Sequence, residues 1–320
     1  MSQPELMRFD EGPRMSRRAL LQVSAATLTC VPAASTHAAV DRFEDLPPVP
    51  MKLPLLVRRE CRFRDGATIR YVTAGRGPVT LVLLHGSNCN WRFFAPQFAA
   101  LSTAYSIVAL DLAGHGDSSR RVGQFSVQAF VDDVAAVVEQ SVPGPFVFVA
   151  HSTGGRVACA AAPQFGDRLL GMVGVDTFHN LAKEPPARAV VDGYVARLRT
   201  DFTASMREYI KPFFQPGTSP QLIAWVERQM LRTVPEDAAQ AGGVLAAFDA
   251  RVPVTGWPRP VVALNSDWVP LDYRKVRSVL PAFDLIVLAG RGHFPNLEDP
   301  AVFNPLIRVT VDRVARSAGI

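Results

Sequence analysis

Short apolar runs that alternate with helical stretches constrain the fold of this chain more than any other feature. A β-hairpin signal comes first, with Asp65-Gly66 between two alternating stretches. The six runs that follow lie at residues 79–84, 106–110, 146–150, 172–175, 260–265 and 284–288. Continuous apolar runs are typical of strands buried on both faces, and their alternation with helices implies a parallel sheet covered on both sides. The sequence therefore predicts an α/β fold, with a mostly parallel, doubly wound sheet of about eight strands.

The alternation stops between residues 178 and 257. Helices are expected elsewhere at about residues 91–101, 126–141, 152–162 and 300–315. Residues 178–257, in contrast, carry amphipathic helical patterning, as in 190–198 and 222–231, without a convincing strand. Because ligands bind at the carboxyl ends of the strands in open α/β sheets, we interpret this insertion after the sixth strand as a helical cap over the site. The core would then comprise residues 57–177 and 258–320, after an extended, proline-rich lead-in at residues 39–56.

One apolar run ends in the segment FVAHSTGG at residues 148–155, which places Ser152 between small residues. This pattern is typical of a nucleophile elbow, in which the chain passes from a strand through a strained turn into a helix and presents the serine hydroxyl. Ala150 occupies the first glycine position of the usual G-x-S-x-G pattern, where a single methyl group is commonly tolerable. The alanine-rich stretch after Ser152 favours the helix that an elbow requires.

A serine hydroxyl needs a base to become a nucleophile, and the usual base is a histidine held by a carboxylate. Of the six histidines, one lies in the N-terminal segment, two precede the serine, one is its neighbour, and one follows the sixth strand too closely to leave room for an acid on a later strand. These excluded histidines are His37, His85, His115, His151 and His179. The base is therefore predicted to be His293, in a glycine-rich loop after the last strand.

Two aspartates could orient His293. Asp267 ends the penultimate strand and precedes His293 by enough residues for a helix and a strand to intervene. Asp176 ends the strand before the insertion and could reach the same imidazole. Aspartates at strand ends are often only turn or cap residues, so one of the two is expected to be structural. We favour Asp267 as the acid, with Asp176 as the alternative.

Three further segments make the chain resemble the α/β hydrolases of the lipase, esterase and haloperoxidase-like type. They are LLHGS at residues 83–87, DLAGHGDS at 111–118 and GHFPNLEDP at 292–300. The resemblance covers about residues 57–318. It implies an oxyanion hole formed by the amides of Ser87 and Thr153. The chain departs from the family pattern at Ala150 and at Asn265-Ser266, where a glycine-rich approach to the acid is more usual.

This resemblance implies a serine hydrolase that cleaves ester or related acyl bonds through an acyl-enzyme, without metal or cofactor. A serine at position 152 argues against the family branches that use an aspartate nucleophile. Carbon–carbon bond hydrolysis and cofactor-free perhydrolysis are alternatives on the same residues. A ligand-binding protein with negligible turnover is an alternative of another class. A small, apolar acyl or ester substrate would suit a pocket lined by aromatic residues flanking the motif loops, namely Trp91, Phe93, Phe94, Phe178 and Trp268.

The N-terminal residues 1–38 resemble a twin-arginine export signal. Arg17-Arg18 precede a moderately apolar run that is too short for a membrane-spanning helix, and a small-residue cleavage site ends at Ala38. We therefore expect a periplasmic or secreted protein without a stable membrane anchor. An amphipathic helix of a cytosolic protein is the alternative.

Charge and cysteine content narrow the remaining classes. The net charge of +5 comes from scattered residues with no interleaved aromatic and basic pattern, so nucleic-acid binding is not expected. Removal of Cys30 with the signal would leave Cys61, Cys89 and Cys159, an odd number that allows at most one disulfide. The spacing leaves the pairing of Cys61 with Cys89 open, and the oligomeric state is not indicated by the sequence.

Overall fold

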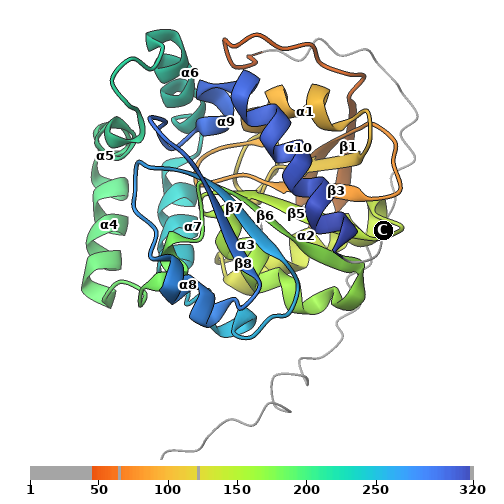
Figure 1. The fold of residues 1–320 in the computed structure, drawn as a ribbon. Helices are drawn as coiled ribbons and strands as arrows, with labels where there is room; N and C mark the ends of the chain where they lie inside the picture. The colour runs from red at the N-terminus through yellow and green to blue at the C-terminus, as the bar shows by residue number, and fades with distance from the viewer. Residues whose placement is uncertain (1–44, 64–65, 121–122, 318–320) are drawn as a thin grey trace, which may run out of the picture.

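The computed structural model describes residues 45–63, 66–120 and 123–317. Their centre is an eight-stranded sheet in the order β1-β2-β4-β3-β5-β6-β7-β8 (Figure 1). The strands are β1 (Val57–Arg62), β2 (Thr68–Ala74), β3 (Thr80–Leu84), β4 (Ser106–Leu110), β5 (Phe146–His151), β6 (Leu169–Val175), β7 (Val261–Ser266) and β8 (Phe283–Leu288). The pairs β1·β2 and β2·β4 are antiparallel, and the remaining pairs are parallel. The predicted α/β fold is therefore confirmed.

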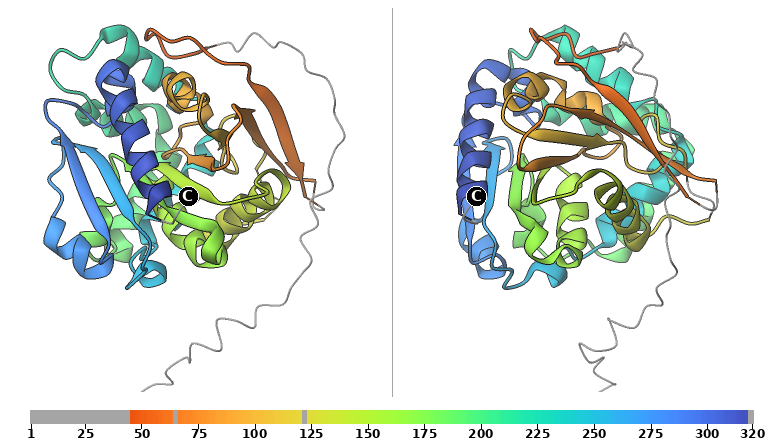
Figure 2. Two further views of the ribbon diagram at one scale, coloured as in Figure 1. Left: turned by 45° about the vertical axis from the view of Figure 1, so that its right-hand side comes forward. Right: turned by 90° about the vertical axis from the view of Figure 1, so that its right-hand side faces the viewer.

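Helices cover both faces of this sheet (Figure 2). They are α1 (Ala95–Leu101), α2 (Val127–Ser141), α3 (Gly154–Ala161), α8 (Tyr273–Val279), α9 (Pro295–Glu298) and α10 (Pro300–Arg316). The strand β5 shows why both faces are buried: Phe146, Phe148 and Ala150 join the core cluster beneath α2 and α3, whereas Val147 and Val149 join the cluster beneath α1 and α10. Successive side chains of a strand point to opposite faces, so a continuous apolar run is what this position requires.

The helix predicted at residues 91–101 begins later than expected. Residues Trp91–Phe94 form a 3₁₀ turn, and the α-helix α1 starts only at Ala95 with Pro96 in its first turn. The side chain of Asn90 accepts a hydrogen bond from the Arg92 amide and starts the tighter turn. Proline has a fixed φ and no amide hydrogen, so it fits the first turn of a helix rather than its interior.

Residues 178–257 contain helices and no strand. The α-helices are α4 (Arg188–Thr200), α5 (Phe202–Ile210), α6 (Pro220–Met230) and α7 (Pro235–Ala247). In Figure 1 they form a layer beside the sheet, and we call residues 178–257 the cap. A separate apolar cluster joins the cap residues Phe213 and Trp225 to Phe93 and Phe294, which follow β3 and β8. The cap is therefore packed against loops at the carboxyl ends of the strands.

Cys89 and Cys159 are buried free thiols, so a Cys61–Cys89 disulfide does not form. Among the described residues, none of the helices has both the length and the apolar character needed to cross a membrane. The expected export signal at residues 1–38 lies outside the described residues, and its function stays a prediction.

Candidate active site

Ser152 occupies a sharp turn between β5 and α3. Its φ of 51° lies in the left-handed region, which is uncommon for a residue with a side chain and is a form of strain often stored at functional sites. The turn is possible because of Gly154, where an added Cβ would lie 2.3 Å from the carbonyl oxygen of Leu84. Ala150 is fully buried and its methyl group joins the core, so a glycine is not needed there.

His293 lies in the loop after β8 and faces Ser152. The distance from its Nε2 atom to the Ser152 Oγ atom is 2.9 Å. The backbone of His293 is fixed on both sides: its amide donates to the Phe213 carbonyl at 2.7 Å, and its carbonyl accepts from His151 Nε2 at 3.0 Å. Gly292 permits the first contact, because a Cβ there would lie 2.1 Å from the Phe213 oxygen. A cap residue therefore helps to position the imidazole.

The carboxylate that faces His293 belongs to Asp176. Its Oδ2 atom accepts a hydrogen bond from His293 Nδ1 at 2.5 Å, and its side chain is fully buried. Burial by itself would raise the pKa of Asp176, but the hydrogen bond and the charge of His293 hold that pKa below its usual value. Asp176 is thus an ionised acceptor, which can fix the tautomer of His293 and stabilise its protonated form.

The preference for Asp267 as the partner of His293 was wrong. Asp267 is exposed, and its Oδ1 atom accepts a hydrogen bond from the Gly290 amide at 2.9 Å, so it closes the loop between the ends of β7 and β8. The two residues before it support the other aspartate instead. Ser266 donates to Asp176, and the Asn265 amide group exchanges hydrogen bonds with the backbone of Thr177. Asn265 and Ser266, at which the chain departs from the family pattern, therefore hold in place the turn after β6 that carries Asp176.

The other histidines near the sheet have structural contacts. His85 Nδ1 donates to the Gly86 carbonyl at 2.8 Å, and its Nε2 accepts from the Leu112 amide at 2.9 Å, which fixes a neutral imidazole. Burial lowers the pKa of His85 to about 3, with a further contribution from His115. Burial and the neighbouring His293 lower the pKa of His151 likewise to about 3. Neither residue is placed to exchange a proton with Ser152.

Ser87 and Thr153 are the residues that the family resemblance implies for an oxyanion site, and Ser87 lines the same pocket as Ser152. The Thr153 hydroxyl lies 3.5 Å from the Ser87 hydroxyl, so the two residues are neighbours across the turn. Within the described part of the chain, neither backbone amide donates a hydrogen bond. Two unpaired amides beside a nucleophile can stabilise developing negative charge on a carbonyl oxygen. Their role here stays a prediction.

The cap supplies most of the apolar side chains around the nucleophile. The narrow pocket that contains Ser152 and His293 is lined from the cap by Tyr209, Phe213 and Met230. The amphipathic pattern of the cap helices does not indicate which of their residues face the nucleophile, so these residues were not predicted. None of the five aromatic residues expected there lines this pocket. Trp91, Phe94 and Phe178 are core residues, Phe93 packs on Trp225, and Trp268 lies with its ring centroid 4.9 Å from that of His293.

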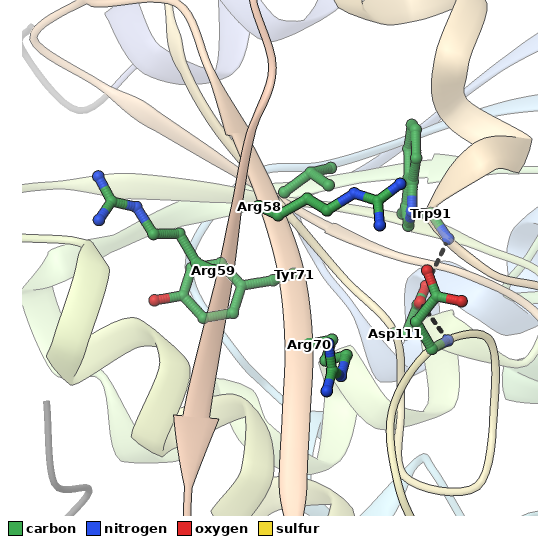
Figure 3. Close-up of a pocket in the computed structure, with 8 residues that line it drawn as sticks. Arg58, Arg59, Arg70, Tyr71, Trp91 and Asp111 are labelled. Atoms are coloured by element: carbon green, nitrogen blue, oxygen red, sulfur yellow. Dashed lines mark hydrogen bonds between the residues drawn. The ribbon is translucent and has the colours of Figure 1, made fainter. Parts of the chain in front are cut away.

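A second cavity is separate from the nucleophile. It lies against β1 and β2 and is lined by Arg58, Arg59, Arg70 and Asp111 (Figure 3). Asp111 belongs to the loop DLAGHGDS at residues 111–118, and its carboxylate accepts from the Trp91 amide at 2.7 Å and the Asp117 amide at 2.8 Å. Asp111 therefore holds the loops beside the sheet together and does not contact His293.

Comparison with known proteins agrees with this fold. The model of the Alpha/beta hydrolase family matches residues 81–306. A pimeloyl-(acyl-carrier protein) methyl ester esterase of Klebsiella pneumoniae is 28% identical over 260 residues, covering 75% of this chain and 96% of that protein. A protein with the same description from Aliivibrio salmonicida is 30% identical over 226 residues, covering 68% and 84%. The structure of a thermophilic esterase from Thermogutta terrifontis superimposes with a TM-score of 0.70 at 22% identity, covering 81% and 99%.

Proposed function

Since this chain belongs to the alpha/beta hydrolase family, we propose that it hydrolyses carboxylic esters through an acyl-enzyme on Ser152. One observation carries the proposal: Ser152 Oγ, His293 and Asp176 form a continuous chain of hydrogen bonds of 2.9 and 2.5 Å. This arrangement lets the imidazole take the serine proton while the carboxylate stabilises the resulting imidazolium. The esterase descriptions of the two curated relatives support the same class of reaction.

In the first half-reaction, the Ser152 oxygen attacks the carbonyl carbon and His293 Nε2 takes its proton. The carbonyl oxygen becomes an oxyanion, to which the amides of Ser87 and Thr153 donate. Removal of one such donor typically costs about 3 kcal/mol of transition-state stabilisation. The bond from carbon to the alcohol oxygen then breaks, and His293 gives its proton to the departing alcohol. The product is an ester between the acyl group and Ser152.

The second half-reaction regenerates the enzyme. His293 Nε2 accepts a proton from water, whose oxygen attacks the acyl carbon. Collapse of the intermediate breaks the bond to Ser152, and His293 returns the proton to the serine oxygen. The acid leaves, and Asp176 remains ionised throughout, as its lowered pKa favours.

The proposal is tested by the hydrolysis of short and medium p-nitrophenyl esters by the wild type and by Ser152→Ala. We expect turnover by the wild type and loss of nearly all of it in the variant, with an unchanged circular dichroism spectrum. If the folded wild type turns over no ester, the esterase assignment fails and a ligand-binding role on the same scaffold gains support.

We further propose that the protein is exported, on the basis of Arg17-Arg18 and the apolar run that follows them. Replacement of both arginines by lysine should leave uncleaved precursor in the cytoplasm of the producing cell. Unchanged export of that variant would overturn this assignment. The measurement is a cell fractionation in which the precursor and the shorter product are separated by mass.

A further inference from the structure

A cavity of about 330 Å³ lies beside the nucleophile, between the α3 end of the elbow and the cap helices α4, α5 and α7. It is lined by residues that include Ser87, Thr153, Arg156, Tyr194, Arg197 and Tyr209. Ser87 and Tyr209 also line the narrow pocket around Ser152. The two spaces therefore adjoin each other at these two residues.

The position of the cavity indicates which half of an ester would occupy it. Its lining includes both residues of the proposed oxyanion site, Ser87 and Thr153, and no residue of the loop that carries His293. In the proposed reaction, His293 protonates the departing alcohol, so the alcohol has to lie on the His293 side. The acyl half then extends on the other side, toward the cavity.

The lining of this cavity is positively charged, which does not suit an apolar acyl group. Two arginines line it, and no aspartate or glutamate does. Arg156 is half-buried and held in place, since its Nη1 donates to the carbonyls of Leu245 at 3.0 Å and Phe248 at 2.9 Å. Both contacts are to neutral acceptors, and the charge of Asp249 acts on the guanidinium only through space, with no hydrogen bond or ion pair to it within the described residues. A partly desolvated cation of this kind favours an anionic partner.

The carboxylate of Asp249, which follows Phe248 in the chain, is hydrogen-bonded to another arginine. Asp249 receives hydrogen bonds from Arg251 Nε at 2.8 Å and from Arg251 Nη2 at 2.7 Å. Arg197, at the exposed side of the cavity, makes no ion pair within the described residues. By contrast, Arg188 and Arg199 of the same helix are paired with Asp192 and Glu236. The two cavity arginines thus differ from their paired neighbours on the cap.

Two tyrosines add neutral donors to the same space. The ring centroids of Tyr194 and Tyr209 lie 6.3 Å apart, and in the described part of the chain neither hydroxyl makes a hydrogen bond. A carboxylate can accept hydrogen bonds from both guanidinium and phenol groups. The lining therefore provides the donors that a terminal carboxylate would require.

We propose that the substrate is an ester whose acyl part ends in a second, ionised carboxylate, which Arg156 and Arg197 bind. The substrate class is thus the monoesters of dicarboxylic acids. This inference rests on the proposed esterase function and names the acyl group that the site prefers. Arg156 supplies the fixed contact at the elbow, and Arg197 supplies the contact at the mouth of the cavity.

The test compares two matched substrates, mono-p-nitrophenyl adipate and p-nitrophenyl hexanoate, which have the same chain length and leaving group. We expect kcat/KM of the wild type to be at least about tenfold higher for the adipate ester. Arg197→Gln should lower kcat/KM for adipate by about threefold to tenfold and Arg156→Lys by about tenfold to a hundredfold, because charge-assisted hydrogen bonds are lost. Both variants should hydrolyse the hexanoate ester within about threefold of the wild type.

Arg188→Gln is the matched control, since it removes the same charge from helix α4 but lies outside the cavity lining. It should leave the preference for adipate unchanged. Arg156→Lys keeps the positive charge, and Arg197 is exposed, so both variants should fold. Equal rates of the wild type on the two esters, or equal losses on both esters in the variants, would overturn this inference while the esterase function stands. If the folded wild type hydrolyses neither of the two esters, the esterase function is overturned and this inference with it.

Discussion

Ser266 donates two hydrogen bonds to a single oxygen of Asp176, one from its backbone amide at 2.9 Å and one from its hydroxyl at 2.8 Å. The other oxygen of Asp176 is thereby left for His293. The two residues lie at the ends of the neighbouring parallel strands β6 and β7. The end of β7 thus orients the carboxylate that follows β6.

The first prediction concerns this contact. Ser266→Ala removes the hydroxyl but keeps the amide, so Asp176 loses one of its two fixed donors. We expect kcat/KM for ester hydrolysis to fall by about threefold to tenfold, equivalent to one hydrogen bond of about 0.5 to 1.5 kcal/mol. In a double variant with Asp176→Asn, the effect of Ser266→Ala should vanish, since the residues act together. Ser278→Ala, on the exposed face of α8, is the control. A full effect in the Asp176→Asn background would contradict the positioning role.

The second prediction separates the two aspartates. Asp176→Asn keeps the shape but removes the charge that stabilises the imidazolium, and kcat should fall by about 10³- to 10⁴-fold. Asp267→Asn should retain kcat within about threefold, because an asparagine oxygen can still accept from the Gly290 amide. Steady-state hydrolysis of one p-nitrophenyl ester by both variants is sufficient. A larger loss in Asp267→Asn would restore that residue as the acid.

The third prediction tests the steric basis of the elbow. Gly154→Ala would place a Cβ 2.3 Å from the Leu84 carbonyl oxygen, in backbone that cannot easily move. We expect the free energy of unfolding to fall by about 3 kcal/mol or more. Gly193→Ala, in helix α4, meets nothing within 4 Å and should be neutral or stabilising by about 0.5 to 1 kcal/mol. Urea unfolding measures both. Equal stability of the two variants would show that the close approach at Gly154 is not required.

The fourth prediction concerns the buried neutral histidines. The pKa of His85 is about 3 in the folded chain and about 6.5 in the unfolded chain, so the unfolded state binds more protons between these values. The resulting stability is fully present above about pH 6.5 and is lost as the pH falls toward 3. Within this window, the free energy of unfolding should change by about 1.4 kcal/mol per pH unit for this histidine.

Urea unfolding of the wild type and of His85→Gln at several pH values between 7.5 and 4.5 measures this contribution. The variant should be less stable at neutral pH, because the contacts to Gly86 and Leu112 are disturbed. Its stability should also depend less steeply on pH below 6.5. Identical slopes for the two proteins would show that His85 is not kept neutral by the fold.

The sequence was sufficient for the elements that depend on local pattern. Strands β3 to β7 are largely apolar runs because both faces of the sheet are covered there, and the elbow at Ser152 is set by neighbouring small residues. His293 could be predicted from its place after the last strand. These features depend on short stretches of chain, in which the spacing of residues determines the local structure.

The choice between Asp176 and Asp267 depends instead on contacts that are distant in sequence. Both residues follow strands whose ends lie side by side, so spacing alone places either of them near His293. Asp176 has φ of 43° and its amide donates to the Leu264 carbonyl, which turns its side chain toward the imidazole. The buried polar pair Asn265-Ser266 was the available signal, since polar residues at a buried strand end need partners. The position of Phe213 against His293 had no such signal.

The most direct measurement of the central claim is labelling of the folded protein with a fluorophosphonate, followed by peptide mapping of the modified residue. We expect one phosphonate on Ser152, no labelling of Ser152→Ala, and labelling that is much slower in Asp176→Asn than in Asp267→Asn. Labelling that persists in Ser152→Ala, or a folded wild type that does not react, would contradict the assignment of Ser152 as the nucleophile.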